Sequence, residues 1–490
     1  MRTFVSIFAL LCLLCSCSED EVISNKIISN ADWIQKGTRF CSNSKELLAF
    51  GSVNIKQLLN KGIYNSELGQ SGLLPLGMID DYKDALFTEL PFYYTVHAGS
   101  ALTMLPRISI LARHKNRELL IKTIKKDLTI SKSITKGDLE VLFFDDFTIG
   151  IGLNNVVFML HDRISELKKI KLIQNSFKSI DNDNQDNLVK EILSASKDIS
   201  LTFNAGNIQD LGIKILNQPE GATTSFDSKV ALHLSFENGK IKIQNKNYFS
   251  NEVLSWNLFG NDSKALISEL GAGSPVAAFL ANINISELER LKNKYFEDGI
   301  SNTLQNSNID QMLLGFIPNE LSVIEALISK DGLNSYFDGN IAMGAYSSDR
   351  IHTEYSAFLG IGSSLAAIIK QEIKPLIGLL ASTNITDSTF SMYTSQLNGP
   401  QNKTAPLKLP TGVETLGNSP ISCYMDFNRF PLKDLFMEEA LPIIELLSMG
   451  TINANVTNSE LTLYMNDSQT NSLTQICNSI PSLLIRLAFL

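Results

Sequence analysis

The stretch VAAFLANINISEL, residues 276–288, indicates how this chain folds. Its first half is a short apolar run typical of a buried strand. Asn284 follows, and an asparagine can end a strand and cap the next helix, because its side chain accepts hydrogen bonds from nearby backbone N–H groups. Leu288 lies where the first helical turn would pack back onto the sheet. The stretch predicts a strand buried on both faces, an Asn cap and a helix.

The same strand–Asn–helix pattern occurs four times along the chain. The four runs and their asparagines are Leu47–Val53 with Asn54, Ile199–Phe203 with Asn204, Val276–Ile283 with Asn284, and Ile421–Phe427 with Asn428. Asn54 and Asn284 are 230 residues apart, and Asn204 and Asn428 are 224 apart. This regular spacing suggests that one half of the chain repeats the other.

A hairpin follows the second and the fourth pattern. Residues 230–243 alternate between apolar and polar around Asn238-Gly239, a dipeptide that strongly favours a hairpin turn. A second hairpin is predicted from alternating residues 452–456 and 461–465 with a turn at Asn458-Ser459-Glu460, and Asn458 lies 220 residues after Asn238. The repeated order predicts an α+β fold of two similar modules, each a mainly antiparallel sheet with helices packed on it. Chance recurrence of common junctions is the alternative, and the two halves could also share one sheet.

The N-terminus predicts the cellular address. Arg2 precedes an apolar run from Phe4 to Leu14, which has the length of a signal peptide and is too short to span a bilayer. The run ends at Leu14-Cys15-Ser16-Cys17, where a small residue precedes a cysteine whose thiol could accept a lipid. We therefore expect a lipoprotein signal peptide at 1–16, acylation of Cys17, a tether at 17–38, and modules at 39–262 and 263–490.

The residues behind Cys17 refine the predicted location. Ser18 resembles an outer-membrane sorting signal, and the acidic run Glu19-Asp20-Glu21 resembles a surface-export signal. A solvated tether would have the same composition. The sequence thus predicts a lipid anchor in the outer membrane. It leaves open whether the folded part of the chain is exposed at the cell surface.

Composition excludes several classes of protein. The chain has 490 residues, 44% hydrophobic and 19% charged, as in folded proteins of more than one domain. A net charge of −9 argues against a general nucleic-acid binder. Cys41, Cys423 and Cys477 allow at most one disulfide, and the sequence leaves open whether any forms. The apolar run from Ala357 to Ala381 contains Lys370, Glu372 and Lys374, so we predict two helix pieces there rather than a membrane span.

No sequence motif for catalysis, metal or cofactor binding stands out. The histidines lack helical metal-ligand spacing, and the acidic loop Asp181–Asp186 fails the calcium pattern because Asp186 stands where glycine is required. The basic stretch from Arg107 to Lys126 could meet an anionic polymer or form a solvated face. Phe92-Tyr93-Tyr94 could stack on a sugar or belong to the core. We predict no catalytic residue, no metal and no cofactor.

One resemblance covers most of the mature chain. The Cys17 segment, the early strand–Asn–helix element, Ser200-Leu201-Thr202-Phe203-Asn204 and the Asn238-Gly239 hairpin look like a family of large Bacteroidota-type cell-envelope lipoproteins described only as a domain of unknown function. The resemblance implies an envelope lipoprotein of α+β fold and assigns no site residue. We predict a non-enzymatic binding or scaffold protein with an unknown protein or polysaccharide partner. The alternative is an envelope hydrolase of glycan or peptide whose residues are scattered in sequence.

Overall fold

A computed structural model describes most of the chain. The described residues are 29–42, 47–66, 82, 84–98, 106–161, 164–181, 186–205, 207, 228–249, 257–296, 332–347, 353–373, 381–394, 407–429 and 441–488. The predicted signal peptide at 1–16 and the predicted lipidation site Cys17 lie outside these residues.

The chain forms two compact units. Unit 1 comprises Met1–Ser250 together with Met465–Leu490, and unit 2 comprises Asn251–Tyr464. The sequence had divided the modules at 262/263 and ended the second at 490. The C-terminal segment belongs with unit 1 because its polar side chains bond to that unit's backbone: the Ser472 hydroxyl donates to Lys240 O over 3.0 Å, and the Thr474 hydroxyl donates to Lys61 O.

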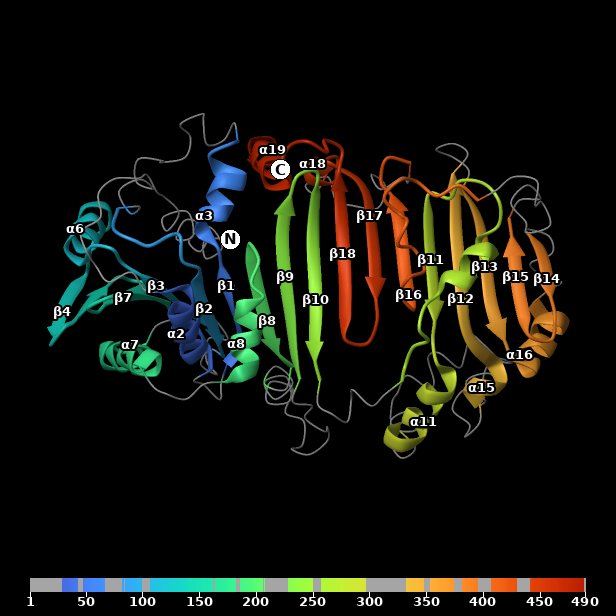
Figure 1. The fold of residues 1–490 in the computed structure, drawn as a ribbon, viewed down its shortest axis with the longest axis horizontal. Coiled ribbons are helices and arrows are strands. Elements are labelled where there is room, and N and C mark those ends of the chain that lie inside the picture. Colours follow the sequence, from blue (N-terminus) through green and yellow to red (C-terminus); the bar gives the residue numbers. More distant parts are fainter. Residues whose placement is uncertain are drawn as a thin grey trace. The chain divides into compact units, whose positions relative to one another are not determined.

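Unit 1 is built on an antiparallel sheet (Figure 1). Its strands lie in the order β4-β5-β6-β7-β3-β2-β1-β8-β9-β10. Their bounds are β1 Leu47–Val53, β2 Phe92–His97, β3 Arg107–Arg113, β4 Lys132–Lys136, β5 Leu139–Phe143, β6 Phe147–Ile151, β7 Asn155–Leu160, β8 Ile199–Asn204, β9 Lys229–Glu237 and β10 Lys240–Tyr248. The helices are α2 Asn30–Ser42, α3 Ile55–Leu58, η1 Leu59–Ile63, α6 Arg117–Asp127, α7 Glu166–Asp181, α8 Asn187–Ser194 and α19 Ser472–Ala488.

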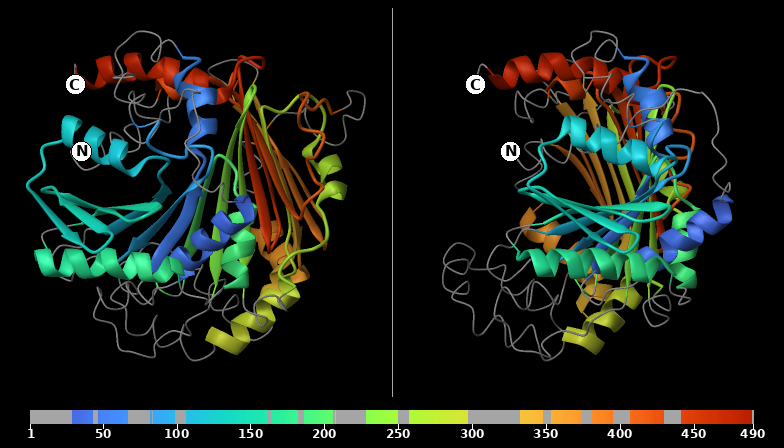
Figure 2. Two further views of the ribbon diagram at one scale, coloured as in Figure 1. Left: turned by 60° about the vertical axis from the view of Figure 1, so that its left-hand side comes forward. Right: turned by 90° about the vertical axis from the view of Figure 1, so that its left-hand side faces the viewer.

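Helices cover both faces of the unit 1 sheet, because successive strand residues point to opposite sides. On one side Phe50 and Tyr93 pack with residues of α2, α7 and α8. On the other side Phe92 and Val156 pack with residues of α3, η1 and α6. Figure 2 shows α6 and α7 on opposite sides of the strands. Each of these cores buries apolar surface, the main favourable term in folding.

The first folded element begins earlier than the tether prediction of 17–38. Helix α2 starts at Asn30, and its Trp33 is fully buried with the indole N–H donating to Pro91 O over 2.8 Å. Helix α19 continues through Pro481. The hairpin at Asn238-Gly239 is confirmed, with Lys240 paired to Glu237 and Gly239 at φ +65°.

Unit 2 is built on a second antiparallel arrangement, in the order β14-β15-β13-β12-β11-β16-β17, with β17 and β18 joined as a hairpin. The strands are β11 Ala277–Asn282, β12 Phe337–Ser347, β13 Thr353–Ile361, β14 Ser382–Ile385, β15 Thr389–Tyr393, β16 Ile421–Asp426, β17 Leu447–Ala454 and β18 Asn458–Met465. The helices are η2 Lys264–Leu270, α11 Ile285–Phe296, α15 Gly332–Tyr336, α16 Ser363–Ile368, η3 Ile369–Ile373 and α18 Leu441–Ile444.

Two features of unit 2 correct the sequence predictions. The run from Ala357, predicted as helix pieces, begins as the end of β13 and becomes helical only at Ser363. One face of the sheet packs Leu280 and Tyr424 against η2 and the segment around Val413. The opposite face keeps Phe279 at 37% exposure, so β11 is not buried on both faces. The broader prediction of an α+β fold with a large antiparallel sheet is confirmed.

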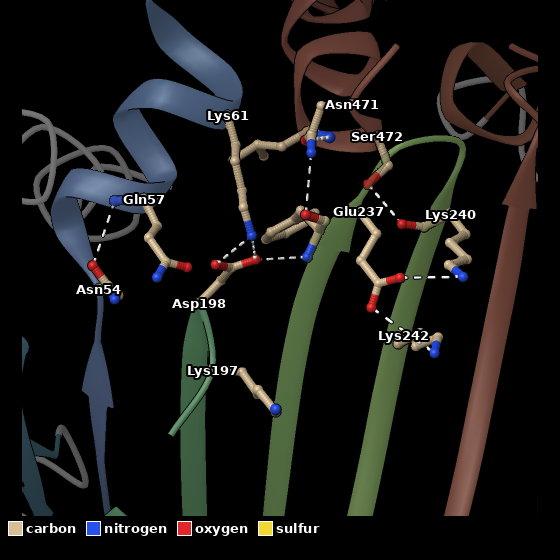
Figure 3. Close-up of polar contacts among 12 residues, drawn as sticks. Asn54, Gln57, Lys61, Lys197, Asp198, Glu237, Lys240, Lys242, Asn471 and Ser472 are labelled. Carbon is tan, nitrogen blue, oxygen red and sulfur yellow. Dashed lines mark hydrogen bonds and ion pairs between the residues drawn. The ribbon is translucent and has the colours of Figure 1, made fainter. Parts of the chain in front are cut away.

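A polar cluster ties three parts of unit 1 together (Figure 3). The buried carboxylate of Asp198, just before β8, accepts from Lys61 Nζ at 2.7 Å through both oxygens and from the backbone N–H of Phe236 at 2.7 Å. Asn471 Nδ2 donates to Phe236 O over 3.1 Å from the C-terminal segment. The cluster joins η1, the β8–β9 pair and the start of α19. Its polar groups satisfy one another's hydrogen bonds, so we assign it a structural role.

Candidate functional site

The open face of the unit 2 sheet is the candidate site. Alternation along the strands gives this face Phe279 of β11, Met343 of β12 and Tyr355 of β13, which retain 37%, 51% and 49% of their surface. Ile452 of β17 is also 37% exposed. Large apolar side chains exposed singly are ordinary, but neighbours on one sheet face form a patch that marks an interaction site.

Strand pairing places these side chains in one cross-strand row. Met343 pairs with Phe279, Phe279 with Cys423, and Cys423 with Ile452. On the other side Met343 pairs with Ala357. Directly opposed residues in antiparallel strands have neighbouring Cβ atoms, so the row is continuous.

A second row beside it is lined mostly by small residues. Ala277 pairs with Ala345 on one side and with Met425 on the other, and Met425 pairs with Gly450. The step from bulky to small side chains hollows the sheet surface. The hollow has a volume of about 610 Å³ and extends to Leu463 of β18. We call this hollow the apolar groove, and its volume falls in the range of small-molecule sites.

The side chains that line the apolar groove are mostly apolar. The described residues that line it include none that is charged, and among them Ser356, Cys423, Tyr355 and Tyr424 are the ones with a polar side-chain group. Burial raises the pKa of the Cys423 thiol, which keeps it protonated and a poor nucleophile. Met343, Met392 and Met425 bring unbranched side chains that adapt to an irregular partner. The groove can therefore hold an apolar ligand, and its described lining residues provide neither a carboxylate nor an imidazole for acid–base chemistry.

The histidines weighed from the sequence are not gathered in one place. Each of the four in the described ranges hydrogen-bonds a neighbour: His97 with Thr95, His114 with Gly152 O, His161 with Thr148 and His233 with Ser200. Burial, with Arg107 adding to it, lowers the pKa of His97 to about 4, and burial also lowers the pKa of His114 and His233. His352 lies outside the described residues. Over the part of the chain that is described, no group of three or more His, Cys, Asp or Glu could hold a metal.

The other residues singled out in the sequence also have structural roles. In the basic stretch, Lys115 pairs with Glu89 at 3.6 Å, and Arg117 and Lys125 pair with Glu140 at 3.7 and 3.1 Å. Tyr93 is fully buried, so the Phe92–Tyr94 stretch belongs to the core. Asp186 caps α8 through bonds to two backbone N–H groups, and residues 182–185 lie outside the description. Cys41 and Cys477 are buried and Cys423 is half-buried, and all three are free thiols.

Sequence reasoning missed the apolar groove. Its residues come from strands widely separated along the chain, and nothing local distinguishes an uncovered apolar strand face from a covered one. The available signal was the three alanines among residues 277–281, since small residues in a strand leave room beside larger neighbours.

Comparison with known proteins adds little. No family model and no curated protein matches the chain. A solved structure, crystal form I of TP0453, is 12% identical, covers 44% of this chain and 78% of that chain, and has a TM-score of 0.25, too low to carry an argument. In the described residues, no helix combines the length and apolarity needed to cross a bilayer.

Proposed function

We propose that this chain is a cell-envelope lipoprotein that binds an acyl chain in the apolar groove and has no enzymatic activity of its own. The observation that carries the proposal is an exposed groove of about 610 Å³ whose lining, among the described residues, is uncharged. A ligand there gains affinity by removing apolar surface from water, about 25 cal/mol for each Å². A polar or charged ligand would lose hydrogen bonds to water without replacement. Flexible methionines suit a flexible chain better than a rigid, hydrogen-bonding ligand.

The groove is tested by placing a charge on it. We expect Met343→Glu to weaken binding of cis-parinaric acid, an 18-carbon fluorescent fatty acid, at least tenfold, because a carboxylate beside the acyl chain would be desolvated without a partner. The matched control is Leu167→Glu on α7, since Leu167 is also highly exposed, at 79%, and lies in the other unit. Binding is measured by fluorescence titration of the purified full chain.

A second readout uses the Cys423 thiol, which lines the groove, whereas Cys41 and Cys477 are buried. We expect the fatty acid to slow maleimide labelling of Cys423, measured by peptide mass spectrometry. Unchanged labelling at saturating fatty acid, or equal affinities for Met343→Glu and the unsubstituted chain, would count against the groove as the binding site.

We further propose that Cys17 carries a lipid that holds the body at the outer membrane. The support is the order of Arg2, the apolar run and the Ser16-Cys17 pair. Cys17→Ala should leave the chain soluble or unprocessed, measured by fractionation of cells and by the mass of the N-terminal peptide. Unchanged membrane retention of the variant would refute the anchor.

Duplication of one ancestral module is our proposal for the origin of the two units. Three observations support it. The order β3-β2-β1-β8-β9-β10 in unit 1 corresponds to β13-β12-β11-β16-β17-β18 in unit 2. Asn54 and Asn284 cap the helices that follow β1 and β11, accepting from Gln57 N and Glu287 N. In each unit a strand serine bonds its cross-strand partner: Ser200 of β8 bonds His233 of β9, and Ser422 of β16 bonds Asn453 of β17.

The proposed equivalence of Asn204 with Asn428 shifts by two residues. Asn204 accepts from the N–H three residues on, and in unit 2 the same bond is made by Asp426 to Arg429 N. An aspartate replaces an asparagine easily at such a position, because both have a short side-chain acceptor. Superposition of the two units should bring Asn54 onto Asn284, and the strand register then brings Thr202 onto Ser422. A match in any other register would argue for independent origins.

A further inference from the structure

A second hollow lies in unit 1 and is chemically opposite to the apolar groove. Its volume is about 470 Å³. Helix α7 supplies Gln174, Phe177, Lys178 and Asp181, a spacing that places them on one helical face. Lys36 of α2, Asp138 of the β4–β5 turn and the β6–β7 turn at 152–155 complete the walls. We call this hollow the polar pocket.

The polar side chains of this pocket lack partners. Among the described residues, Lys36, Asp138, Gln174, Lys178 and Asp181 make no side-chain hydrogen bond or ion pair with the protein, and Asp138, Lys178 and Asp181 are exposed to solvent. The Oδ1 atom of Asn155, a residue only 7% exposed, is also unpaired. Elsewhere on unit 1 opposite charges do pair, as in Lys132 with Glu166 at 2.6 Å. A buried acceptor without a donor costs about 1–3 kcal/mol.

The walls of the polar pocket are held in place without a ligand. Buried His114 hydrogen-bonds Gly152 O through Nε2 at 3.0 Å, and its backbone N–H donates to Asn154 O at 3.3 Å. Gly152 admits the Phe177 ring, since a Cβ there would lie 2.8 Å from a ring carbon. Burial lowers the pKa of Lys36, with Asp181 opposing the shift. The β6–β7 turn and the aromatic wall are therefore in place before binding, which lowers the entropy cost of binding.

The balance of charges selects the ligand class. Lys36 and Lys178 offset Asp138 and Asp181, so the side chains that line the pocket carry no net charge, and the nearby Arg113 and Arg39 add to the positive charge around Lys36. Lys178 and Asp181 are interleaved on the same helical face, so the pocket has no separate positive and negative ends for a zwitterion. A hydroxyl both donates and accepts, and therefore matches ammonium, carboxylate and amide groups alike. We infer that the polar pocket binds an uncharged saccharide through its hydroxyl groups.

The inference is tested with the purified full chain on an array of neutral oligosaccharides of glucose, mannose, galactose and N-acetylglucosamine, with uronic-acid and sulfated glycans on the same array. We expect binding to neutral glycans. Calorimetric titration of the strongest neutral binder should then show at least tenfold weaker affinity for Gln174→Leu and for Lys178→Met, equivalent to about 1.4 kcal/mol or more.

Lys168→Met is the matched control, because Lys168 is an exposed lysine of the same helix and does not line the pocket. It should bind as the unsubstituted chain does, as should Met343→Glu in the apolar groove. Three results would each overturn the inference: no neutral glycan binds, only charged glycans bind, or both pocket variants keep full affinity while circular dichroism shows them folded.

Discussion

Replacing Asp198 with alanine should lower the free energy of unfolding by about 3 kcal/mol, measured by urea denaturation followed by circular dichroism. Asp198 is 1% exposed, and its carboxylate accepts from Lys61 and from the Phe236 backbone N–H. The alanine would leave that N–H without its acceptor, at the cost of an unmade buried hydrogen bond. The Lys61 ammonium is 30% exposed and can return to solvent, so the lost acceptor dominates the effect.

Two variants separate the charge of Asp198 from its hydrogen bonds. Asp198→Asn keeps an acceptor for Phe236 N and should lose clearly less stability than the alanine variant. Glu166→Ala removes an exposed ion pair, with side chains 49% and 54% exposed, and should change the free energy of unfolding by less than about 1 kcal/mol. Equal losses for Asp198→Ala and Glu166→Ala would mean that the cluster of Figure 3 does not hold unit 1 together.

Elements coded by adjacent residues were predictable from the sequence. Asn238-Gly239 specifies a hairpin because the turn chemistry and the flanking alternation act over a few residues, and β9 and β10 pair as expected. The caps at Asn54 and Asn284 are local for the same reason. The α+β class follows from such elements taken together, since strands and helices each bury one face against the other.

The candidate sites depend on contacts between residues far apart in sequence. Phe279 meets Met343 and Cys423 only because β11 lies between β12 and β16, and no local pattern states that order. Apolar alternation also looks the same whether the face is packed or open. The polar pocket had a partial signal, because Gln174, Lys178 and Asp181 form a polar stripe on a helix with an apolar opposite face. A polar stripe usually faces water, so the stripe alone did not indicate a pocket.

The start of unit 1 gives the other large expected effect. Trp33→Ala should lower the free energy of unfolding by about 4 kcal/mol, as large-to-small substitutions in cores do. The Trp33 side chain is fully buried, its ring centroid lies 5.8 Å from that of Tyr93, and its indole N–H donates to Pro91 O. Truncation would remove this packing, leave a cavity between α2 and β2, and orphan a carbonyl. Urea denaturation followed by far-ultraviolet circular dichroism measures the loss, since the substitution removes a fluorophore.

The conservative change Trp33→Phe divides the effect into its parts. Phenylalanine keeps an aromatic ring against Tyr93 and loses the bond to Pro91 O, so we expect about 1–2 kcal/mol of destabilisation. The two losses should therefore differ by at least about 2 kcal/mol, the share due to packing. That difference shows whether residues 30–38 belong to the core, as part of α2, or form a tether. A tether residue would tolerate either substitution. If Trp33→Ala unfolds at the same urea concentration as the unsubstituted chain, residues 30–38 are a tether and not part of the core.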